Sequence, residues 1–540
     1  MEDLIVIEAV GKRDTLKKLC TDLGMEVRVF ATNGHINAMP NTLDPIGIDS
    51  EFKEYAREAK APWAIDMLKK DASECNNIYI ATDADSEGDV IAWDVYEYIK
   101  EINKKIFRIK LKGIDKEAIE EAFSNPSKIS KEDAIPGRTR SIIDRVVGAV
   151  FSKDGIAVGR VSTALLGAIA KDKPTPYYLT LIAPAKDGKR PFIAETPIKP
   201  PLNQKIAKQL EEFSFPAINM EKSNNISRVP NDMSGILISA GDNMDLSPKE
   251  ASQSMQRLYE GGNISYPRSS SGSINKAAAR KMRRIAKKAG FMFNENQLPE
   301  KSENAVHDSP HPLKEIDLTH DPKKLDVDDG LMTHIARDII KTGQKHIEEI
   351  GKPVEIKKAM EGKFSKEVID YVVNLHWRRE QGPKYPGKKD WPQSEIRTRR
   401  VDTVLLEVMK NNNLGKPSTW PNHIDNFMKR GLIDNDMNLT NKGKAWLLKS
   451  PKQLINPKIS AAIEKACENY PKEILSVPDK EPWEVLSKKI VSVLPQEIKD
   501  EINISLAKEK APEKVLDSTI ENDNNVSNPN MKMDMEYKLR

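Results

Sequence analysis

Short apolar runs and segments with helical spacing alternate over the first 130 residues. The runs at 4–9, 26–36, 77–85 and 106–114 have the length and composition of buried strands. The segments at 12–24, 89–100 and 115–123 place apolar residues at helical intervals, and the first of these ends at a glycine. A turn is expected at Asn33-Gly34. Strands alternating with helices predict a parallel α/β domain at the start of the chain.

The remainder of the chain changes pattern several times. Residues 130–170 are helical in spacing, 176–197 alternate like strands, and 245–290 form a helical block rich in Lys and Arg. Residues 352–400 show little helix or strand pattern, and 401–500 are helical again. Residues 518–540 contain few large apolar side chains, which predicts disorder. No repeat of fixed period occurs.

Length and composition narrow the protein class. A chain of 540 residues is expected to form several domains. Its net charge of +4, from 85 basic and 81 acidic residues, excludes a histone-like polycation but permits a local basic groove. The three cysteines form no CxxC pair, which excludes a zinc ribbon and argues against a disulfide framework. There is neither a signal peptide pattern nor an apolar run of ~20 residues, so we expect a cytoplasmic protein without membrane contact.

Three acidic residues stand at alternate positions where the third apolar run ends: Asp83, Asp85 and Glu87. On an extended chain they would point to one side, at the strand end where α/β sheets bind ligands. Two carboxylates ~4 Å apart repel by roughly 4 kcal/mol at an effective dielectric of about 20, and Mg²⁺ commonly offsets such repulsion. Glu8, which closes the first run, could join them. The alternative is an acidic first turn of a helix, which the helix dipole favours.

The segment "QRLYEGGNISYPRSSS", residues 256–271, carries a second candidate. Pro267 favours extended geometry at the residue before it, so Tyr266 and Arg268 would point the same way. A phenol is a poor nucleophile until a nearby cation favours its anion. Arg268 could supply that cation and could also hold a phosphate through two donors. By itself, however, a Tyr-Pro-Arg sequence is more often an ordinary strand end.

The acidic pattern resembles the TOPRIM domain of topoisomerases, primases and some nucleases. Together with the tyrosine segment it resembles the type IA topoisomerases, and further motifs follow in the order of that family between residue 4 and about residue 448. The matching segments are IVIEAVGK, VFATNGHI, ATDADSEGDVIAW, IDRVVGAVFS, GRVSTALLGAI, LYEGGNISYPRSSS, AVHDSPHPL and LGKPSTWPNHIDNFMKRGLI.

The resemblance implies an ATP-independent topoisomerase that cleaves and reseals one DNA strand, relaxing negative supercoils or unlinking DNA. Tyr266 would attack the strand and keep its 5′-phosphate, and Arg268 would stabilise the phosphate charge. Lys12 would help to protonate the leaving oxygen, and Glu8 would lie near that oxygen or the metal. The expected ligands of Mg²⁺ are Asp83, Asp85, Glu87 and Glu8. The sequence contains no GxxxxGK[ST] phosphate loop, in agreement with a reaction that needs no ATP.

The family motifs also suggest contacts to single-stranded DNA by a monomeric protein. Two helix starts offer backbone donors and polar side chains to phosphate, although simple N-capping would explain them equally well. Trp420 could stack on a base but is more often a core residue at a helix start. The expected DNA-binding residues are Arg160, Ser162, Thr163, His307, Lys416, Ser418 and Thr419.

Some positions depart from the family pattern. The family's Thr-Asp-Ser is here Ser269, Ser270 and Ser271, and His311 stands where the histidine motif usually has an arginine. We expect these changes to affect the strength of substrate binding and the reaction rate more than the class of reaction. Two rival hypotheses remain. One is a TOPRIM nuclease or primase, and the other, which the Ser270 departure supports, is a catalytically weakened DNA-binding relative.

The family fold implies a multidomain α/β and α protein in the form of a torus. The N-terminal TOPRIM domain is Rossmann-like, and the arch and the helical gate are each built from two separate chain segments. The expected division is TOPRIM at 1–130, gate at 131–172, β-rich arch at 173–240, tyrosine-bearing helical domain at 241–325, second arch segment at 326–395, second gate segment at 396–505 and a disordered tail at 506–540.

Overall fold

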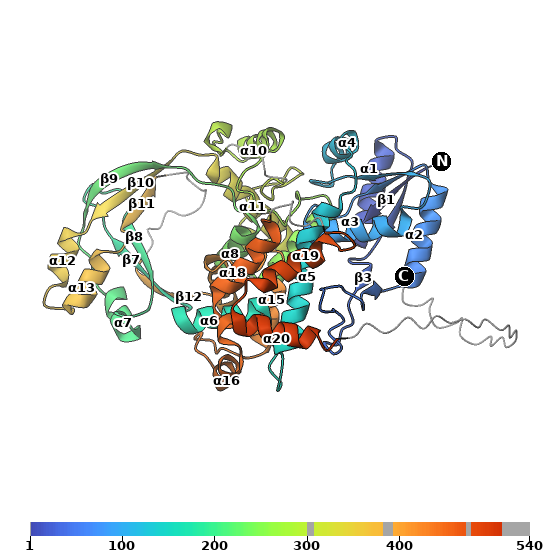
Figure 1. The fold of residues 1–540 in the computed structure, drawn as a ribbon. Helices are drawn as coiled ribbons and strands as arrows, with labels where there is room; N and C mark the ends of the chain where they lie inside the picture. The colour runs from blue at the N-terminus through green and yellow to red at the C-terminus, as the bar shows by residue number, and fades with distance from the viewer. Residues whose placement is uncertain (1, 300–306, 382–392, 471–476, 510–540) are drawn as a thin grey trace, which may run out of the picture.

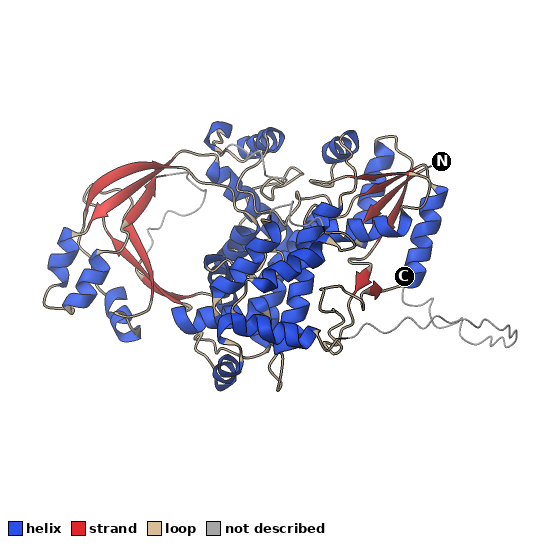
Figure 2. Cartoon of the chain, viewed as in Figure 1, coloured by secondary structure: helices blue, strands red, loops and turns tan. Residues whose placement is uncertain are grey.

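The computed structural model describes residues 2–299, 307–381, 393–470 and 477–509. It consists of an N-terminal α/β domain, a central helical body and a curved antiparallel sheet on the far side of that body (Figures 1 and 2). Most of the tail that we predict to be disordered lies outside the described residues. Within the described residues, no helix is both long and apolar enough to cross a membrane.

The N-terminal domain contains a four-stranded parallel sheet in the order β2-β1-β5-β6, as the strand–helix alternation predicts. Leu4 and Val6 of β1 pack on one face of the sheet, and Ile5 and Ile7 pack on the other. Because both faces are covered by helices, β1 is apolar at every position from Leu4 to Ile7. The elements are β1 (Asp3–Ile7), α1 (Arg13–Asp22), β2 (Val27–Ala31), β3 (Asn37–Ala38), β4 (Glu58–Ala59), α2 (Pro62–Glu74), β5 (Asn77–Ile80), α3 (Ser86–Ile99), β6 (Lys105–Arg108) and α4 (Lys116–Ser124).

Helix α2 was not predicted from the sequence. Its signals are a proline at the first helical position and apolar residues at Ile65, Leu68 and Ala72, which pack against the sheet. The predicted turn at Asn33-Gly34 is present, and both residues have positive φ angles of 54° and 85°.

The helical body collects segments from three regions of the chain. Its largest core joins α6 to the helices around the tyrosine segment and to α14 and α15, and a second core joins α5 to α18, α19 and α20. The helices are α5 (Lys131–Phe151), α6 (Arg160–Asp172), α8 (Met233–Met244), α9 (Pro248–Glu260), α10 (Lys276–Lys288), α11 (Val327–Thr342), α14 (Val401–Asn411), α15 (Trp420–Lys429), α16 (Asn441–Lys449), α17 (Lys452–Ile455), α18 (Pro457–Glu468), α19 (Pro482–Ser492) and α20 (Gln496–Leu506).

The curved sheet, here called the arch, has six strands in the order β12-β7-β8-β11-β10-β9. All its strand pairs are antiparallel, and three short helices pack with it around Phe192 and Trp377. The elements are β7 (Tyr177–Ala183), β8 (Phe192–Pro197), α7 (Gln204–Glu211), β9 (Asn219–Ile226), β10 (His346–Lys352), α12 (Val354–Met360), α13 (Lys366–Val373), β11 (Arg378–Gln381) and β12 (Glu395–Thr398).

The arch corrects one expectation from the sequence. Residues 352–400, which show little periodic pattern, contain α12, α13, β11 and β12. Each of these elements has eight residues or fewer, too few for a periodic pattern to emerge. In addition, α11 lies inside the range predicted for the second arch segment, but its buried side chains belong to the core of the helical body.

Two pairs of neighbouring strands connect the arch to the helical body. Strand β7 follows α6 and pairs with β12, which precedes α14. Strand β9 precedes α8 and pairs with β10, which follows α11. The arch therefore leaves the body at one place and returns at another, which gives the molecule a ring-like outline (Figure 1).

Candidate active site

Tyr266 lies where the helical body meets the N-terminal domain. Helix α9 ends before Gly261, and Gly262 follows with a φ of +66°. A side chain at Gly262 would come within 2.5 Å of the carbonyl oxygen of Ile114, so the close approach requires glycine. Four residues later, the backbone N–H of Tyr266 donates to the carbonyl of Lys112 at 3.0 Å. The tyrosine segment is thus docked directly on the N-terminal domain.

The hydroxyl of Tyr266 donates a hydrogen bond to Asp85 Oδ2 at 2.7 Å, and Arg268 Nη1 lies 3.5 Å from the same oxygen. The structure therefore unites two segments that are 181 residues apart in sequence. Burial raises the pKa of Tyr266 well above its ordinary value of 10.0, and the charges of Asp85 and Asp83 add to this effect while Arg268 opposes it. In this closed arrangement the phenol keeps its proton.

His307 packs against the tyrosine. The two ring centroids are 4.5 Å apart, and His307 Nε2 lies 2.8 Å from the carbonyl oxygen of Ala84. A carbonyl only accepts, so Nε2 carries the proton and Nδ1 is the unprotonated nitrogen. Nδ1 is buried and has no hydrogen-bond partner among the described residues. Burial lowers the pKa of His307, which favours this neutral form.

Lys12 is connected to Tyr266 through a second aromatic ring, that of Tyr259. Its ammonium group forms a buried ion pair with Asp83 and lies 4.7 Å from the centre of the Tyr259 ring. The Tyr259 ring meets the Tyr266 ring edge to face, with centroids 5.4 Å apart. One buried aromatic ring therefore contacts both the predicted nucleophile and the predicted acid. Sequence reasoning missed Tyr259, because an apolar position on α9 looks like any other core residue.

Glu8 completes an acidic cluster with Asp83 and Asp85. Burial, together with the negative charges of Asp83 and Asp85, raises the pKa of Glu8 to about 7. One of its carboxylate oxygens, Oε2, is buried and has no hydrogen-bond partner among the described residues. Burial would also raise the pKa of Asp85, but Arg268, the backbone N–H of Gly88 and the Tyr266 hydroxyl outweigh it and hold that pKa below the ordinary value.

The alternative reading of the acidic triplet, an acidic first turn of a helix, holds for Glu87, which lies in the first turn of α3. Asp85 is the N-cap of α3 and accepts from the backbone N–H groups of Glu87 at 3.1 Å and Gly88 at 2.8 Å. A side chain at Gly88 would lie 2.0 Å from the carbonyl oxygen of Asp83, so the tight connection needs glycine.

Glu87, the third residue of the triplet, lies in the first turn of α3 and not on an extended strand. Strand β5 ends at Ile80 and α3 begins at Ser86, so the alternation of an extended chain does not reach Glu87. Its carboxylate instead lies 2.9 Å from His35 Nε2 and 3.4 Å from Arg140 Nη1.

The acidic cluster has the donor chemistry of a site for a hard divalent cation. Carboxylate oxygens are the ligands that Mg²⁺ prefers, and the unpartnered oxygen of Glu8 could serve as one. In the arrangement described, Lys12 pairs with Asp83 and Tyr266 with Asp85. Across residues 2–299, 307–381, 393–470 and 477–509, no three His, Cys, Asp or Glu side chains are placed to hold one ion. The residues fit a metal in type, and Glu8, Asp83 and Asp85 are the ones that could hold it.

The raised pKa of Glu8 predicts an effect on stability in metal-free protein. The folded chain holds the Glu8 proton more tightly than the unfolded chain, so the wild type loses stability as pH rises from about 4.5 to about 7. Glu8→Gln removes the charge and should stabilise the protein by roughly 2 kcal/mol above about pH 7. Thermal unfolding with and without the substitution, at about pH 4.5 and about pH 8, measures this. A variant no more stable than the wild type at the higher pH would contradict the assignment.

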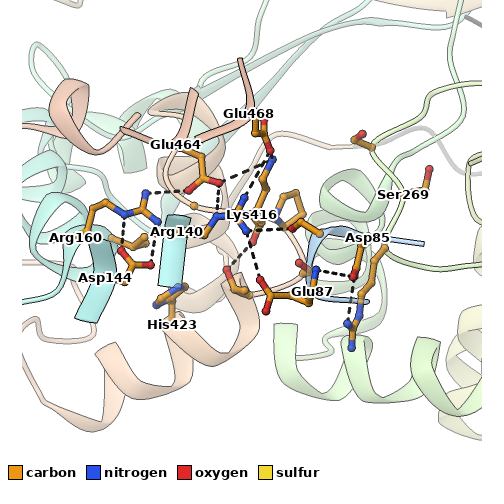
Figure 3. Close-up of a pocket in the computed structure, with 18 residues that line it drawn as sticks. Asp85, Glu87, Arg140, Asp144, Arg160, Ser269, Lys416, His423, Glu464 and Glu468 are labelled. Carbon is orange, nitrogen blue, oxygen red and sulfur yellow. Dashed lines mark hydrogen bonds and ion pairs between the residues drawn. The ribbon is translucent and has the colours of Figure 1, made fainter. Parts of the chain in front are cut away.

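A cavity of about 300 Å³ extends from Asp85 and Arg268 into the helical body (Figure 3). Of the predicted DNA-binding residues, it is lined by Arg160, Lys416, Ser418 and Thr419. Sequence reasoning missed five other ionisable residues of its lining: Arg140, Asp144, His423, Glu464 and Glu468. Asp144 and His423 lie within segments that match the family motifs, which was the signal that could have found them.

The remaining predicted DNA-binding positions have other surroundings. His307 is in the tyrosine cluster, and neither Ser162 nor Thr163 lines the cavity. Thr163 is buried, and its hydroxyl accepts from the backbone N–H of Gly159 at 3.2 Å. The N-cap of α6 is Gly159 and makes no side-chain cap hydrogen bond, so simple N-capping by Ser162 or Thr163 is not observed. Trp420 is a core residue: it is buried, and its indole N–H donates to the carbonyl of Leu414 at 2.6 Å.

The positions that depart from the family pattern lie close to the site. Ser269 and Ser270 line the cavity. His311 is buried and joined to Ser265 of the tyrosine segment by three hydrogen bonds, one of them between its Nδ1 and Ser265 Oγ at 3.1 Å. Its backbone N–H donates to Ser265 Oγ at 3.0 Å, and the Ser265 N–H donates to its carbonyl at 2.9 Å. These bonds hold the histidine motif against the residue that precedes Tyr266.

Comparisons with known proteins give a consistent result. A Toprim domain model matches residues 3–114, and a DNA topoisomerase model matches residues 128–393. The DNA topoisomerase 1 of Campylobacter jejuni is 29% identical over 336 residues, which cover 56% of this chain and 47% of that protein. The chain thus spans about half the length of this curated relative. The structure of full-length topoisomerase I from Thermotoga maritima has the same fold, with a TM-score of 0.60 at 18% identity, covering 91% of this chain and 90% of that one.

Proposed function

Because the chain belongs to the type IA DNA topoisomerases, we propose that it cleaves one DNA strand through Tyr266, passes a strand through the break and reseals it without ATP. The observation that carries this proposal is the hydrogen bond of 2.7 Å from the Tyr266 hydroxyl to Asp85, with Arg268 beside the same oxygen. It joins a nucleophile to a group that can accept its proton and to a cation that suits a phosphate.

The reaction is a transesterification: one phosphorus–oxygen bond forms, one breaks, and the net charge does not change. The Tyr266 oxygen forms a bond to phosphorus as the bond from phosphorus to the 3′-oxygen of the neighbouring nucleotide breaks. The phenol proton leaves through Asp85, which already accepts it in a hydrogen bond. The 3′-oxygen takes a proton from Lys12. Resealing is the reverse, so the energy of the broken bond is kept in the phosphotyrosine.

The charged residues have separate tasks in this scheme. Arg268 places its guanidinium over the phosphate, where it stabilises the negative charge of the transition state. Lys12 is held by Asp83 and by the face of Tyr259, so its ammonium group has a fixed position near the leaving oxygen. The unprotonated Nδ1 of His307 offers a hydrogen-bond acceptor beside the tyrosine.

Glu8, Asp83 and Asp85 would hold Mg²⁺, with Glu87 as the further ligand expected from the sequence. Bound there, the ion would supply positive charge beside the phosphate and offset the repulsion among these carboxylates. The raised pKa of Glu8 supports this assignment, since it arises from burial and, after that, from the negative charges of Asp83 and Asp85, which a bound cation would offset.

The substrate we propose is a single-stranded segment of negatively supercoiled or partly unwound DNA, bound in the cavity beside Arg268 by a monomeric, cytoplasmic protein. Tyr266 is only 1% exposed, so a strand cannot reach it while the tyrosine segment is docked. The segment must therefore move away from the N-terminal domain when DNA enters. A TOPRIM nuclease or primase is not favoured, because the family model that matches residues 128–393 is that of a DNA topoisomerase.

An oligonucleotide assay tests the proposed chemistry. The protein is incubated with Mg²⁺ and a single-stranded oligonucleotide labelled at either its 5′ or its 3′ end, and the products are separated under denaturing conditions. A 5′-phosphotyrosine linkage leaves only the 3′ label on the protein. Supercoiled plasmid with Mg²⁺ and no ATP should relax in steps. Cleavage without an adduct would indicate a nuclease, and binding without cleavage would indicate the weakened relative.

A further inference from the structure

The charge of the cavity is unusual for a surface that binds phosphates. Among its described lining residues are four arginine or lysine side chains and five aspartate or glutamate side chains. Burial lowers the pKa of the remaining titratable group, His423, which favours its neutral form. Carboxylates therefore outnumber permanent cations at this surface, and the cations cannot all be open to a DNA backbone.

Two glutamates of α18, one helical turn apart, form most of the ion pairs with the cations of the cavity (Figure 3). Glu464 is the inner one, with 9% of its side chain exposed. Its two oxygens accept from Arg140 Nε at 2.8 Å and from Arg160 Nη1 at 2.9 Å. A carboxylate held by two arginines in a buried place is costly to displace, because each arginine would lose one of its charged partners.

Glu468 is the outer glutamate, with 39% of its side chain exposed. It forms an ion pair with Lys416 and lies 3.7 Å from Arg140 Nη2. That nitrogen is buried and makes no hydrogen bond with any described residue. Ion pairs that are partly open to water are weak. The carboxylate of Glu468 therefore lies between two cationic groups and is bound there only weakly. A DNA phosphate could bind at the same position.

We infer that Glu468 competes with DNA phosphate for Lys416 and Arg140, and that it moves aside when a single strand binds, while Glu464 stays and positions the two arginines. The inference rests on the proposed function, since it assigns the cavity to DNA. Glu468 would then limit the affinity for single strands and favour their release after resealing, whereas Glu464 would support their binding.

The opposite effects of two neighbouring glutamates make the inference testable. Binding of a fluorescent single-stranded oligonucleotide is measured without metal in the Tyr266→Phe background, in which no cleavage is expected. Glu468→Gln should bind about two- to fivefold more tightly, since it removes a weak competitor. Glu464→Gln should bind about tenfold more weakly, since both arginines lose a charged partner. In a Lys416→Met background, most of the gain from Glu468→Gln should disappear.

The outcomes separate this inference from the proposed function. If the Tyr266→Phe parent binds the oligonucleotide but Glu468→Gln leaves affinity unchanged or lowers it, the competition is refuted while the function stands. If the gain persists fully without Lys416, it arises from general charge and the inference is likewise refuted. If the parent does not bind DNA, the proposed function fails and this inference fails with it. Should Glu464→Gln not fold, the comparison of Glu468→Gln with and without Lys416 decides.

Discussion

Tyr266→Phe is expected to abolish DNA cleavage, the covalent adduct and plasmid relaxation altogether, because the ring without its oxygen cannot form the bond to phosphorus. The fold should survive, since phenylalanine keeps the edge-to-face contact with Tyr259 and the packing against His307. The hydrogen bond to Asp85 is lost, at a cost of about 1–3 kcal/mol for a buried acceptor. Relaxation assays and denaturing gels measure the activity, and thermal unfolding checks the fold.

Tyr259→Phe is the matched control for this substitution. It is a buried tyrosine on the same segment, its ring contacts Tyr266, and phenylalanine keeps its face toward Lys12. We expect it to retain the covalent adduct. An adduct that persists in Tyr266→Phe, or that is lost equally in both variants, would show that the nucleophile has been assigned to the wrong residue.

Arg268→Ala should lower the rate of cleavage and resealing by about 100- to 1,000-fold, the usual cost of removing one group that stabilises transition-state charge. Its guanidinium lies beside Asp85, opposes the rise in the pKa of Tyr266 and would be the main cation near the phosphate. Arg268→Lys should recover only part of the rate, since lysine keeps the charge but not the paired donors. Single-turnover cleavage of an oligonucleotide separates this effect from weaker binding.

Arg257→Ala provides the comparison for the second prediction. Arg257 lies on α9 and pairs with Asp328, with 55% of its side chain exposed. Exposed ion pairs contribute about 0–1 kcal/mol, so this variant should keep its rate within about threefold. If Arg268→Ala were as active as Arg257→Ala, the phosphate role of Arg268 would be wrong.

The sequence contained enough to predict the acidic cluster of Glu8, Asp83 and Asp85, because these residues follow buried strands directly. Apolar runs that are covered on both faces mark the strands, and the carboxyl ends of parallel neighbours meet at one edge. Strands β1 and β5 do pair in parallel, which brings Glu8 near Asp83. The link to Tyr266 came only from the order of the family motifs, since no local pattern joins residues 181 positions apart.

What could not be predicted depends on packing between distant segments. The direction of Glu87 follows from where α3 begins, a boundary that propensity places only within a few residues. Glu464 and Glu468 belong to a helix that lies about 300 positions from Arg140 and Arg160 in the sequence. Their spacing on α18 is that of any solvent-facing helix, so only the fold reveals that they face a cavity. Trp420 is the opposite case: its residue type suits base stacking on DNA, but the fold buries it in the core.

The way in which the arch is attached determines how the molecule would respond to tension. Covalent backbone runs through both strand pairs that join the arch to the body, β7 with β12 and β9 with β10. The contact between the tyrosine segment with His307 and the N-terminal domain includes hydrogen bonds and the ion pair of Arg268 with Asp85. A molecule stretched by force would have to break that contact and open the core shared by α6, α8, α9 and α14, whereas both attachments are held by covalent backbone. On release it would close again, with the arch acting as a tether that keeps the two surfaces aligned.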